Sequence, residues 1–258
     1  IVSYEDFEPF IEKARQGNPD VFWPGKIKHF AKSSGTTNAK SKFIPISDES
    51  LQNCHYKAGK DLLAIYINNH KDSNLFKFKN LRLGGSAELY ESFGTKFGDL
   101  SAILIENLPF WVERTTTPSR EVSLMSEWET KLKAIVSEVK NKDVGSLTGV
   151  PSWMMVLLQR VLKDTGKKSI SEVWPNLEVF FHGGISFVPY REQYKQLIGK
   201  DIRYYEIYNA SEGFFGIQDR FGSDEMLLML DYGIFYEFIQ MDTFGTENTK
   251  AVSLENVE

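Results

Sequence analysis

The chain has 258 residues, of which 41% are hydrophobic and 25% charged, and its formal net charge is −5. This composition is ordinary for a globular protein, and a chain of this size can bury roughly 75% of its unfolded surface. The acidic balance disfavours nucleic acid as the main partner, because phosphate backbones attract basic surfaces. No membrane span is predicted either, since the sequence lacks a sufficiently long apolar run.

Cys54 is the single cysteine, which excludes an internal disulfide, and its polar neighbours suggest neither a metal centre nor a thiol nucleophile. We therefore expect a reducing, cytoplasmic location. The chain begins at Ile1 without a methionine, shows no signal peptide, and stops at Glu258. Both ends are expected to be truncated.

The first part of the chain predicts two helices and two short strands. Ser3 can cap a helix whose apolar residues recur at helical spacing. Residues 27–30 and 43–46 are predicted as strands on either side of a Ser/Gly/Thr-rich loop, so that loop lies at a hairpin-like connection. Pro45 suits an edge strand. A long helix is predicted over residues 47–69.

The rest of the chain alternates strands and helices. Strands are predicted at residues 81–83, 147–150, 179–181 and 202–207, and as an antiparallel pair at 227–230 and 235–239. Helices are predicted at residues 121–140, 153–163 and 189–197. The order strand, helix, strand favours an α/β sheet, in which ligands bind at the carboxyl ends of the strands.

The Ser/Gly/Thr-rich loop is the first candidate site. Its hydroxyls and glycine turn suit a phosphate chain, whose oxygens accept several short hydrogen bonds at once. Lys40 and Lys42 follow and are interpreted as solvated rather than phosphate-binding. The loop lacks the Gly-Lys-Ser/Thr ending of a Walker loop. The candidate phosphate-binding residues are Ser33, Ser34, Gly35, Thr36 and Thr37.

Two further candidate loops follow consecutive predicted strands. Gly183 and Gly184 come after the buried strand 179–181, and residues 208–212 come after the strand 202–207. The loops lie side by side if their strands are neighbours in one sheet. Together they offer small residues beside a flat ring, a tyrosine to stack on it, a hydroxyl for phosphate and a carboxylate for Mg²⁺. These groups match the needs of a nucleotide.

Ser-Ser-Gly-Thr-Thr at 33–37 and Tyr-Asn-Ala-Ser-Glu at 208–212 resemble the first two signature motifs of the auxin-responsive promoter (Gretchen Hagen) family of acyl-acid amido synthetases. The segments 149–153 and 181–184 stand at matching places, and the likeness, nearest to the bacterial branch, covers essentially the whole chain. It implies an α/β adenylate-forming fold of mixed sheets with flanking helices, incomplete at both ends. Residues 1–258 would be part of the large N-terminal domain, without the mobile C-terminal domain.

The resemblance also implies a reaction. A carboxylic acid is activated with MgATP to an acyl-AMP, and the acyl group then passes to an amine, commonly an amino acid. Thr36, Ser211 and Glu212 would be catalytic, with Ser211 on the α-phosphate and Glu212 holding Mg²⁺. The loop 33–37 would hold the ATP phosphates. The residues beside adenine would be Gly183, Gly184 and Tyr208. Because the attacking carboxylate is already ionised, the reaction needs charge neutralisation and alignment rather than a general base.

The family's third motif, whose aspartate binds ribose, has no match here, so this fragment alone is expected to be inactive. Two other functions stay open: a coenzyme A-dependent acyl ligase, and a nucleotide- or acid-binding protein without catalysis. His182 is equally consistent with a hydrogen-bonded core residue and a pocket wall. Trp111, Trp128 and Trp153 are interpreted as core rather than as lining of an acyl pocket. The acid, the amine and the oligomeric state stay unassigned.

Overall fold

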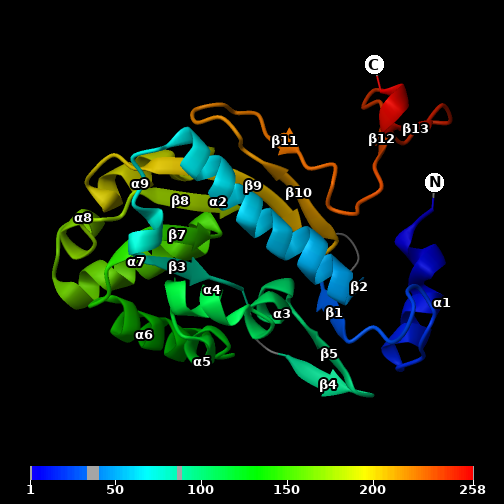
Figure 1. Cartoon of the computed structure of the whole chain (residues 1–258), viewed down its shortest axis with the longest axis horizontal. Coiled ribbons are helices and arrows are strands. Elements are labelled where there is room, and N and C mark those ends of the chain that lie inside the picture. Colours follow the sequence, from blue (N-terminus) through cyan, green and yellow to red (C-terminus); the bar gives the residue numbers. More distant parts are fainter. Residues whose placement is uncertain (1, 34–40, 86–88, 258) are drawn as a thin grey trace.

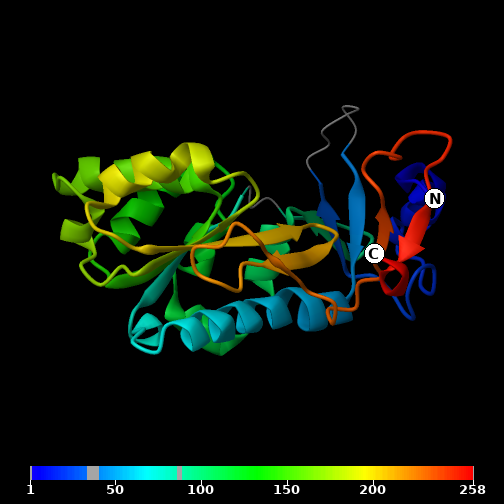
Figure 2. The same ribbon diagram turned by 90° about the horizontal axis from the view of Figure 1, so that it is seen from above.

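The computed structural model describes residues 2–33, 41–85 and 89–257 (Figure 1). Over these residues the main element is a seven-stranded sheet with helices on both faces, and a four-stranded sheet stands toward one end (Figures 1 and 2). The predicted α/β architecture of mixed sheets with flanking helices is therefore confirmed. In the described part of the chain, no helix combines the length and the apolar character that crossing a membrane requires.

Five parallel strands form most of the large sheet, and two antiparallel strands extend it at one side. In spatial order its strands are β11 (Leu227–Leu228), β10 (Gly213–Ile217), β9 (Arg203–Ala210), β8 (Val179–Gly183), β7 (Val144–Gly149), β3 (Lys79–Leu83) and β6 (Thr116–Thr117). Because β3, β7, β8 and β9 run in the same direction, their carboxyl ends share one edge of the sheet.

Different helices cover the two faces of this sheet (Figure 2). The π-helix η1 (Ser50–Tyr56) and the helix α2 (Lys57–Asn69) cover one face. The opposite face carries α6 (Trp128–Val139), α7 (Pro151–Thr165), α8 (Ile170–Val173) and α9 (Arg191–Ile198). Alternate residues of β8 serve both layers, since Val179 and Phe181 pack with the α2 cluster and Phe180 packs with the other. The prediction of a strand buried on both faces is confirmed.

The smaller sheet has the strand order β2 (Phe43–Ile46), β1 (His29–Lys32), β5 (Thr95–Gly98) and β4 (Tyr90–Ser92). Strands β1 and β2 pair antiparallel, as predicted, and Pro45 lies on the edge strand β2. The helix α1 (Tyr4–Arg15) packs on this sheet. Its cap is the predicted one, because the backbone N–H and the hydroxyl of Ser3 both donate to Asp6 Oδ2, at 2.8 and 2.9 Å.

The remaining helices are short. They are η2 (Leu75–Lys77), α3 (Leu100–Glu106), α4 (Phe110–Thr115), α5 (Arg120–Ser123), η3 (Val188–Tyr190) and η4 (Leu254–Asn256). The predicted single helix over residues 121–140 is wrong, because the chain divides there into α5 and α6. The carboxylate of Glu127 accepts hydrogen bonds from the backbone N–H groups of Glu129 and Thr130, at 2.9 and 2.7 Å, and so starts a new helix.

The predicted antiparallel pair of residues 227–230 and 235–239 is also wrong. Instead, β11 pairs with β10, and β12 (Glu237–Ile239) pairs with β13 (Ala251–Ser253). The intervening segment is attached to α2 rather than free to form a turn. The hydroxyl of Tyr232 donates to Asp61 Oδ2 at 2.9 Å, and Asp231 accepts from Lys57 Nζ at 2.7 Å.

Candidate functional site

Two of the three candidate loops meet at the carboxyl edge of the large sheet. Strands β8 and β9 are parallel neighbours, and Gly183 pairs with Ile207. Gly183 is buried, and a Cβ atom added to it would lie 2.3 Å from the carbonyl oxygen of Ile207. Gly184 is exposed and has a φ of +84°, a region that favours glycine. The predicted adjacency of these loops is therefore confirmed, and both glycines have a backbone reason to be there.

The segment 208–212 is the tip of a hairpin, not the free loop that the sequence predicts. Strand β9 continues to Ala210, and a two-residue turn, Ser211-Glu212, leads into the antiparallel strand β10. The ladder continues because Gly213 and Phe214 pair back onto β9, and the backbone N–H of Phe214 also donates to the Sγ atom of Cys54 at 3.2 Å. Ser211 is half-buried and Glu212 is exposed at the tip.

Tyr208 presents its ring at this edge. The side chain is 55% exposed, and its ring centroid lies 5.1 Å from that of Phe215 at an interplanar angle of 46°. Tyr208 is therefore not a core residue, and an exposed aromatic face next to a hydroxyl and a carboxylate is suited to stacking against a flat base.

The first motif is described only at its start. The backbone N–H of Ser33 donates to the carbonyl of Lys42 at 2.9 Å, which closes the base of the β1–β2 connection. Lys42 is exposed, and its ammonium lies 4.9 Å from the centre of the Tyr4 ring. The other residues predicted for phosphate binding, Ser34, Gly35, Thr36 and Thr37, and also Lys40, lie outside the described residues.

His182 belongs to the core rather than to a pocket wall. It is 3% exposed and stacks on Phe187 with ring centroids 4.2 Å apart. Burial lowers the pKa of His182 to about 4, and the charge of Arg191 acts in the same direction. In the part of the chain that the structure describes, its Nδ1 atom has no hydrogen-bond partner.

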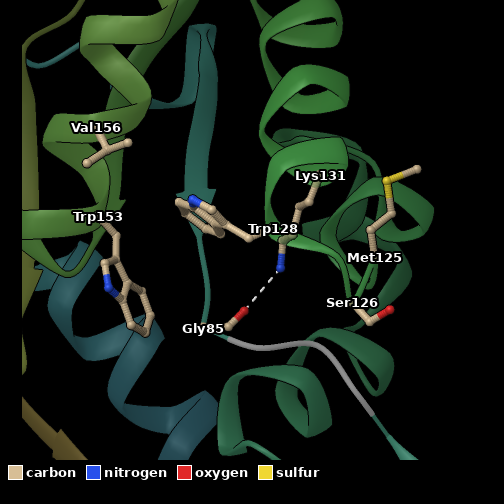
Figure 3. Close-up of a pocket in the computed structure, with 7 residues that line it drawn as sticks. All are labelled: Gly85, Met125, Ser126, Trp128, Lys131, Trp153 and Val156. Carbon is tan, nitrogen blue, oxygen red and sulfur yellow. Dashed lines mark hydrogen bonds between the residues drawn. The ribbon is translucent and has the colours of Figure 1, made fainter.

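Gly183 and Gly184 at the carboxyl end of β8 form what we call the glycine edge, and a pocket of about 390 Å³ lies beside it. Figure 3 shows the pocket. It is lined by Gly85, Met125, Ser126, Trp128, Lys131, Trp153 and Val156. Trp128 and Trp153 were predicted as core residues and instead face this space, whereas Trp111 is 57% exposed on α4. Sequence reasoning missed Lys131, although a lysine beside Leu132 on the apolar side of α6 is a signal that could have identified it.

The pocket and the glycine edge are joined by the start of α7. Val150 caps this helix, and its Cγ2 atom lies 3.4 Å from the place of a Cβ atom on Gly184. Trp153 follows in the first turn. The predicted helix 153–163 is present but extends two residues further at each end, from Pro151 at the first helical position to Thr165 before Gly166. A molecule in the pocket would therefore adjoin the edge formed by Gly184.

The sequence model of the GH3 family N-terminal domain matches residues 1–202, which is more than half of the chain. The chain belongs to the GH3 family. The family resemblance drawn from the motifs is thereby confirmed. A segment of 53 residues is 40% identical to the jasmonoyl–L-amino acid synthetase JAR6 of Nicotiana attenuata, and covers 20% of this chain and 9% of that protein.

The fold of this GH3 family chain is also found in two solved structures. All of the chain matches the AtGH3.15 acyl acid amido synthetase in complex with 2,4-DB, with a TM-score of 0.78 and 14% identity, and covers 54% of that chain. A second structure, of the GH3.15 acyl acid amido synthetase, gives a TM-score of 0.74 and 13% identity, with 53% of its chain covered. The chain thus spans about half the length of the solved structures it matches. They confirm the predicted fold.

Proposed function

We propose that the full-length protein that contains this chain activates a carboxylic acid with ATP to an acyl-adenylate, with release of pyrophosphate. The acyl group is then transferred to an amine, such as an amino acid, to form an amide, with release of AMP and a proton. The observation that carries the proposal is the meeting of Gly184, Tyr208 and the Ser211-Glu212 turn at one sheet edge, in a chain of the GH3 family. The names of the relatives, an acyl acid amido synthetase and a jasmonoyl–L-amino acid synthetase, support this class of reaction.

The residues at the edge fit a nucleotide. The exposed ring of Tyr208 can stack on adenine, and Gly184 leaves space next to it because it has no side chain. The hydroxyl of Ser211 then donates to the α-phosphate. The first motif, including Thr36, is proposed to hold the remaining phosphates from the β1–β2 connection.

Glu212 is the proposed protein ligand of Mg²⁺. In the described parts of the chain, no three His, Cys, Asp or Glu side chains gather as a metal site. A single exposed carboxylate suits Mg²⁺ all the same, because this ion is usually held by one or two carboxylates together with substrate phosphates and water. When bound, the ion neutralises phosphate charge that would otherwise repel an attacking carboxylate.

The chain's own residues then act by positioning. The acid is already ionised at neutral pH, so none of them must remove a proton before attack on the α-phosphorus. Ser211 holds the phosphoryl oxygen, and Tyr208 with Gly184 fixes the base, so that the acid approaches in line. We place residues 1–258 within the large N-terminal domain of a cytoplasmic enzyme of the bacterial branch. A mobile C-terminal domain is proposed to complete the amine site.

ATP–pyrophosphate exchange by the full-length protein tests this proposal, with pooled aromatic and aliphatic acids and Mg²⁺. Exchange should depend on acid and should fall about 100-fold in Glu212→Gln and in Ser211→Ala, which is the scale of one lost electrostatic contact in a transition state. Glu192→Gln removes another exposed carboxylate, at the start of α9, and should leave the rate unchanged. Saturable ATP binding without exchange would overturn the proposal in favour of a binding protein, and thioester formation with coenzyme A in place of an amide would overturn the second step.

A further inference from the structure

The pocket beside the glycine edge has large apolar walls. The rings of Trp128 and Trp153 lie with their centroids 6.5 Å apart at 53°, and Met125 and Val156 complete the apolar lining. At about 390 Å³ the pocket is near the small end of ligand pockets, which span about 300–1,000 Å³. Two indole rings around a small volume favour a flat, compact ligand over a long flexible chain.

One cation interrupts this apolar lining. The side chain of Lys131 is only 3% exposed, and Nζ donates a hydrogen bond to the carbonyl of Gly85 at 3.0 Å (Figure 3). Burial lowers the pKa of Lys131, and the charge of Asp99 opposes that shift. An ammonium group has three N–H donors, and the described residues supply only this one acceptor. A buried donor without a partner is costly, so an acceptor on the ligand would lower the free energy of the complex.

The position of Lys131 indicates how a ligand would be oriented in the pocket. Trp153 and Lys131 reach into the pocket from opposite sides, with Trp128 between them (Figure 3). Trp153 belongs to the helix whose cap, Val150, adjoins Gly184 at the end of β8. Lys131 instead binds Gly85, which follows β3, two strands away from β8. A ligand with one end at the glycine edge therefore has its other end at Lys131.

We propose that this pocket is the acyl pocket of the enzyme and that it selects a flat aromatic carboxylic acid with a hydrogen-bond acceptor at the end remote from the carboxylate. Lys131 is the specificity-determining residue that meets this acceptor. The inference rests on the proposed function, because it assigns the acid of that reaction.

The test compares acids in matched pairs in the exchange assay on the full-length protein. The probes are benzoate with 4-hydroxybenzoate, phenylacetate with 4-hydroxyphenylacetate, and hexanoate as the acid without a ring. The hydroxylated member of each pair should have the higher kcat/KM by roughly 10-fold or more, the effect of one hydrogen bond to a charged group. Lys131→Met should abolish this preference while the preference for rings over hexanoate remains. Lys133→Met, an exposed lysine of the same helix, should leave both preferences unchanged.

A pocket-filling variant tests the location of the acid independently of Lys131. Val156→Trp should raise the KM for every aromatic acid at least 10-fold without changing ATP binding, and circular dichroism checks that it folds. A uniform loss for all acids in Lys131→Met would show that Lys131 only supports the Gly85 segment, and would overturn the inference. So would an unchanged acid profile in both variants.

Equilibrium dialysis with radiolabelled acids separates this inference from the proposed function. If no acid supports exchange, the proposed function fails, but the pocket can still be judged by binding. Tighter binding of 4-hydroxybenzoate than of benzoate, lost in Lys131→Met, would support the pocket as an aromatic acid site. Equal binding of the two acids by the unmodified protein would overturn it.

Discussion

The glycine edge, where we propose that the nucleotide binds, and the proposed acyl pocket share the start of α7 but are built in opposite ways. The glycine edge is formed mainly by backbone, because Gly183 and Gly184 have no side chains and the hairpin of β9 and β10 presents only small or exposed groups. The pocket is shaped by bulk, with two indole rings and a buried lysine. A ligand that never changes, such as a nucleotide, can be bound by backbone geometry. A ligand that distinguishes one enzyme from another requires side chains that can be exchanged.

Gly183→Ala should have the largest effect on the edge. The added Cβ atom would lie 2.3 Å from the carbonyl oxygen of Ile207 and 3.0 Å from its Cγ1 atom, so relief requires β8 and β9 to separate. We expect a loss of about 3 kcal/mol in the free energy of unfolding, the upper part of the range for overpacking, together with weaker ATP binding. Urea unfolding and ATP titration measure the two effects.

The control for this variant is Gly59→Ala in α2. Apart from the neighbouring residues and the backbone of its own helix, no atom lies within 4 Å of the added Cβ there. The substitution should therefore stabilise the protein by up to about 1 kcal/mol, the helix preference of alanine over glycine. If Gly183→Ala unfolds at the same urea concentration as the unmodified protein, the close approach of the two strands is not what requires glycine.

Lowering the pH should destabilise the folded protein through two buried histidines, His55 and His182. Burial lowers the pKa values of His55 and His182 to about 4, from about 6.5 in an unfolded chain. Above pH 6.5 these imidazoles are neutral in both the folded and the unfolded chain. Between pH 6.5 and pH 4 only the unfolded chain binds the protons, so the free energy of unfolding decreases as the pH is lowered. Each histidine should cost about 2–3 kcal/mol by pH 4.5.

Urea unfolding at pH 7.0 and pH 4.5 measures this loss, and the difference between the unmodified protein and His182→Gln isolates one histidine. The variant should lose about 2–3 kcal/mol less between the two pH values than the unmodified protein. An identical loss in both proteins would show that His182 is protonated in the folded state as readily as in the unfolded one.

The smallest expected effect concerns the support of the hairpin. Cys54→Ala would leave the buried backbone N–H of Phe214 without its acceptor, at a cost of about 1 kcal/mol because sulfur is a weak acceptor. Cys54→Ser retains an acceptor and should recover part of that loss in thermal unfolding. Binding of aromatic acids in the proposed acyl pocket should be unchanged in both Cys54 variants. A loss of acid binding that parallels the loss of stability would show that the hairpin and the pocket are not independent.

The edge was predictable from sequence because its chemistry is local. Gly183 and Gly184 follow an apolar run, and Pro151 marks the start of α7, so each signal lies within a few residues. The hairpin was missed because its strand pairing depends on tertiary contacts such as that of Cys54 with Phe214. The helix start at Glu127 was missed because glutamate is not a common cap residue.

The pocket could not be predicted in the same way. Its lining comes from three separate segments, at Gly85, at residues 125–131 and at residues 153–156. Periodicity shows that Trp128 and Trp153 lie on apolar sides of helices. It does not show that their side chains line a pocket rather than pack in the core. Only the order of β3, β7 and β8 in the sheet brings these segments together.

Helix α2 packs against strands that the ribosome makes much later. The hydroxyl of Tyr66 donates to Glu178, 112 positions further along the chain, and the Tyr66 ring lies edge-on against Phe181 and Tyr205. At about 5–20 residues per second, roughly 6 to 22 s of synthesis separate the two partners. Throughout that interval the contacts that β8 and β9 supply to the apolar side of α2 are missing. We therefore expect the nascent chain to be most open to aggregation, or to capture by a chaperone, before β8 and β9 emerge.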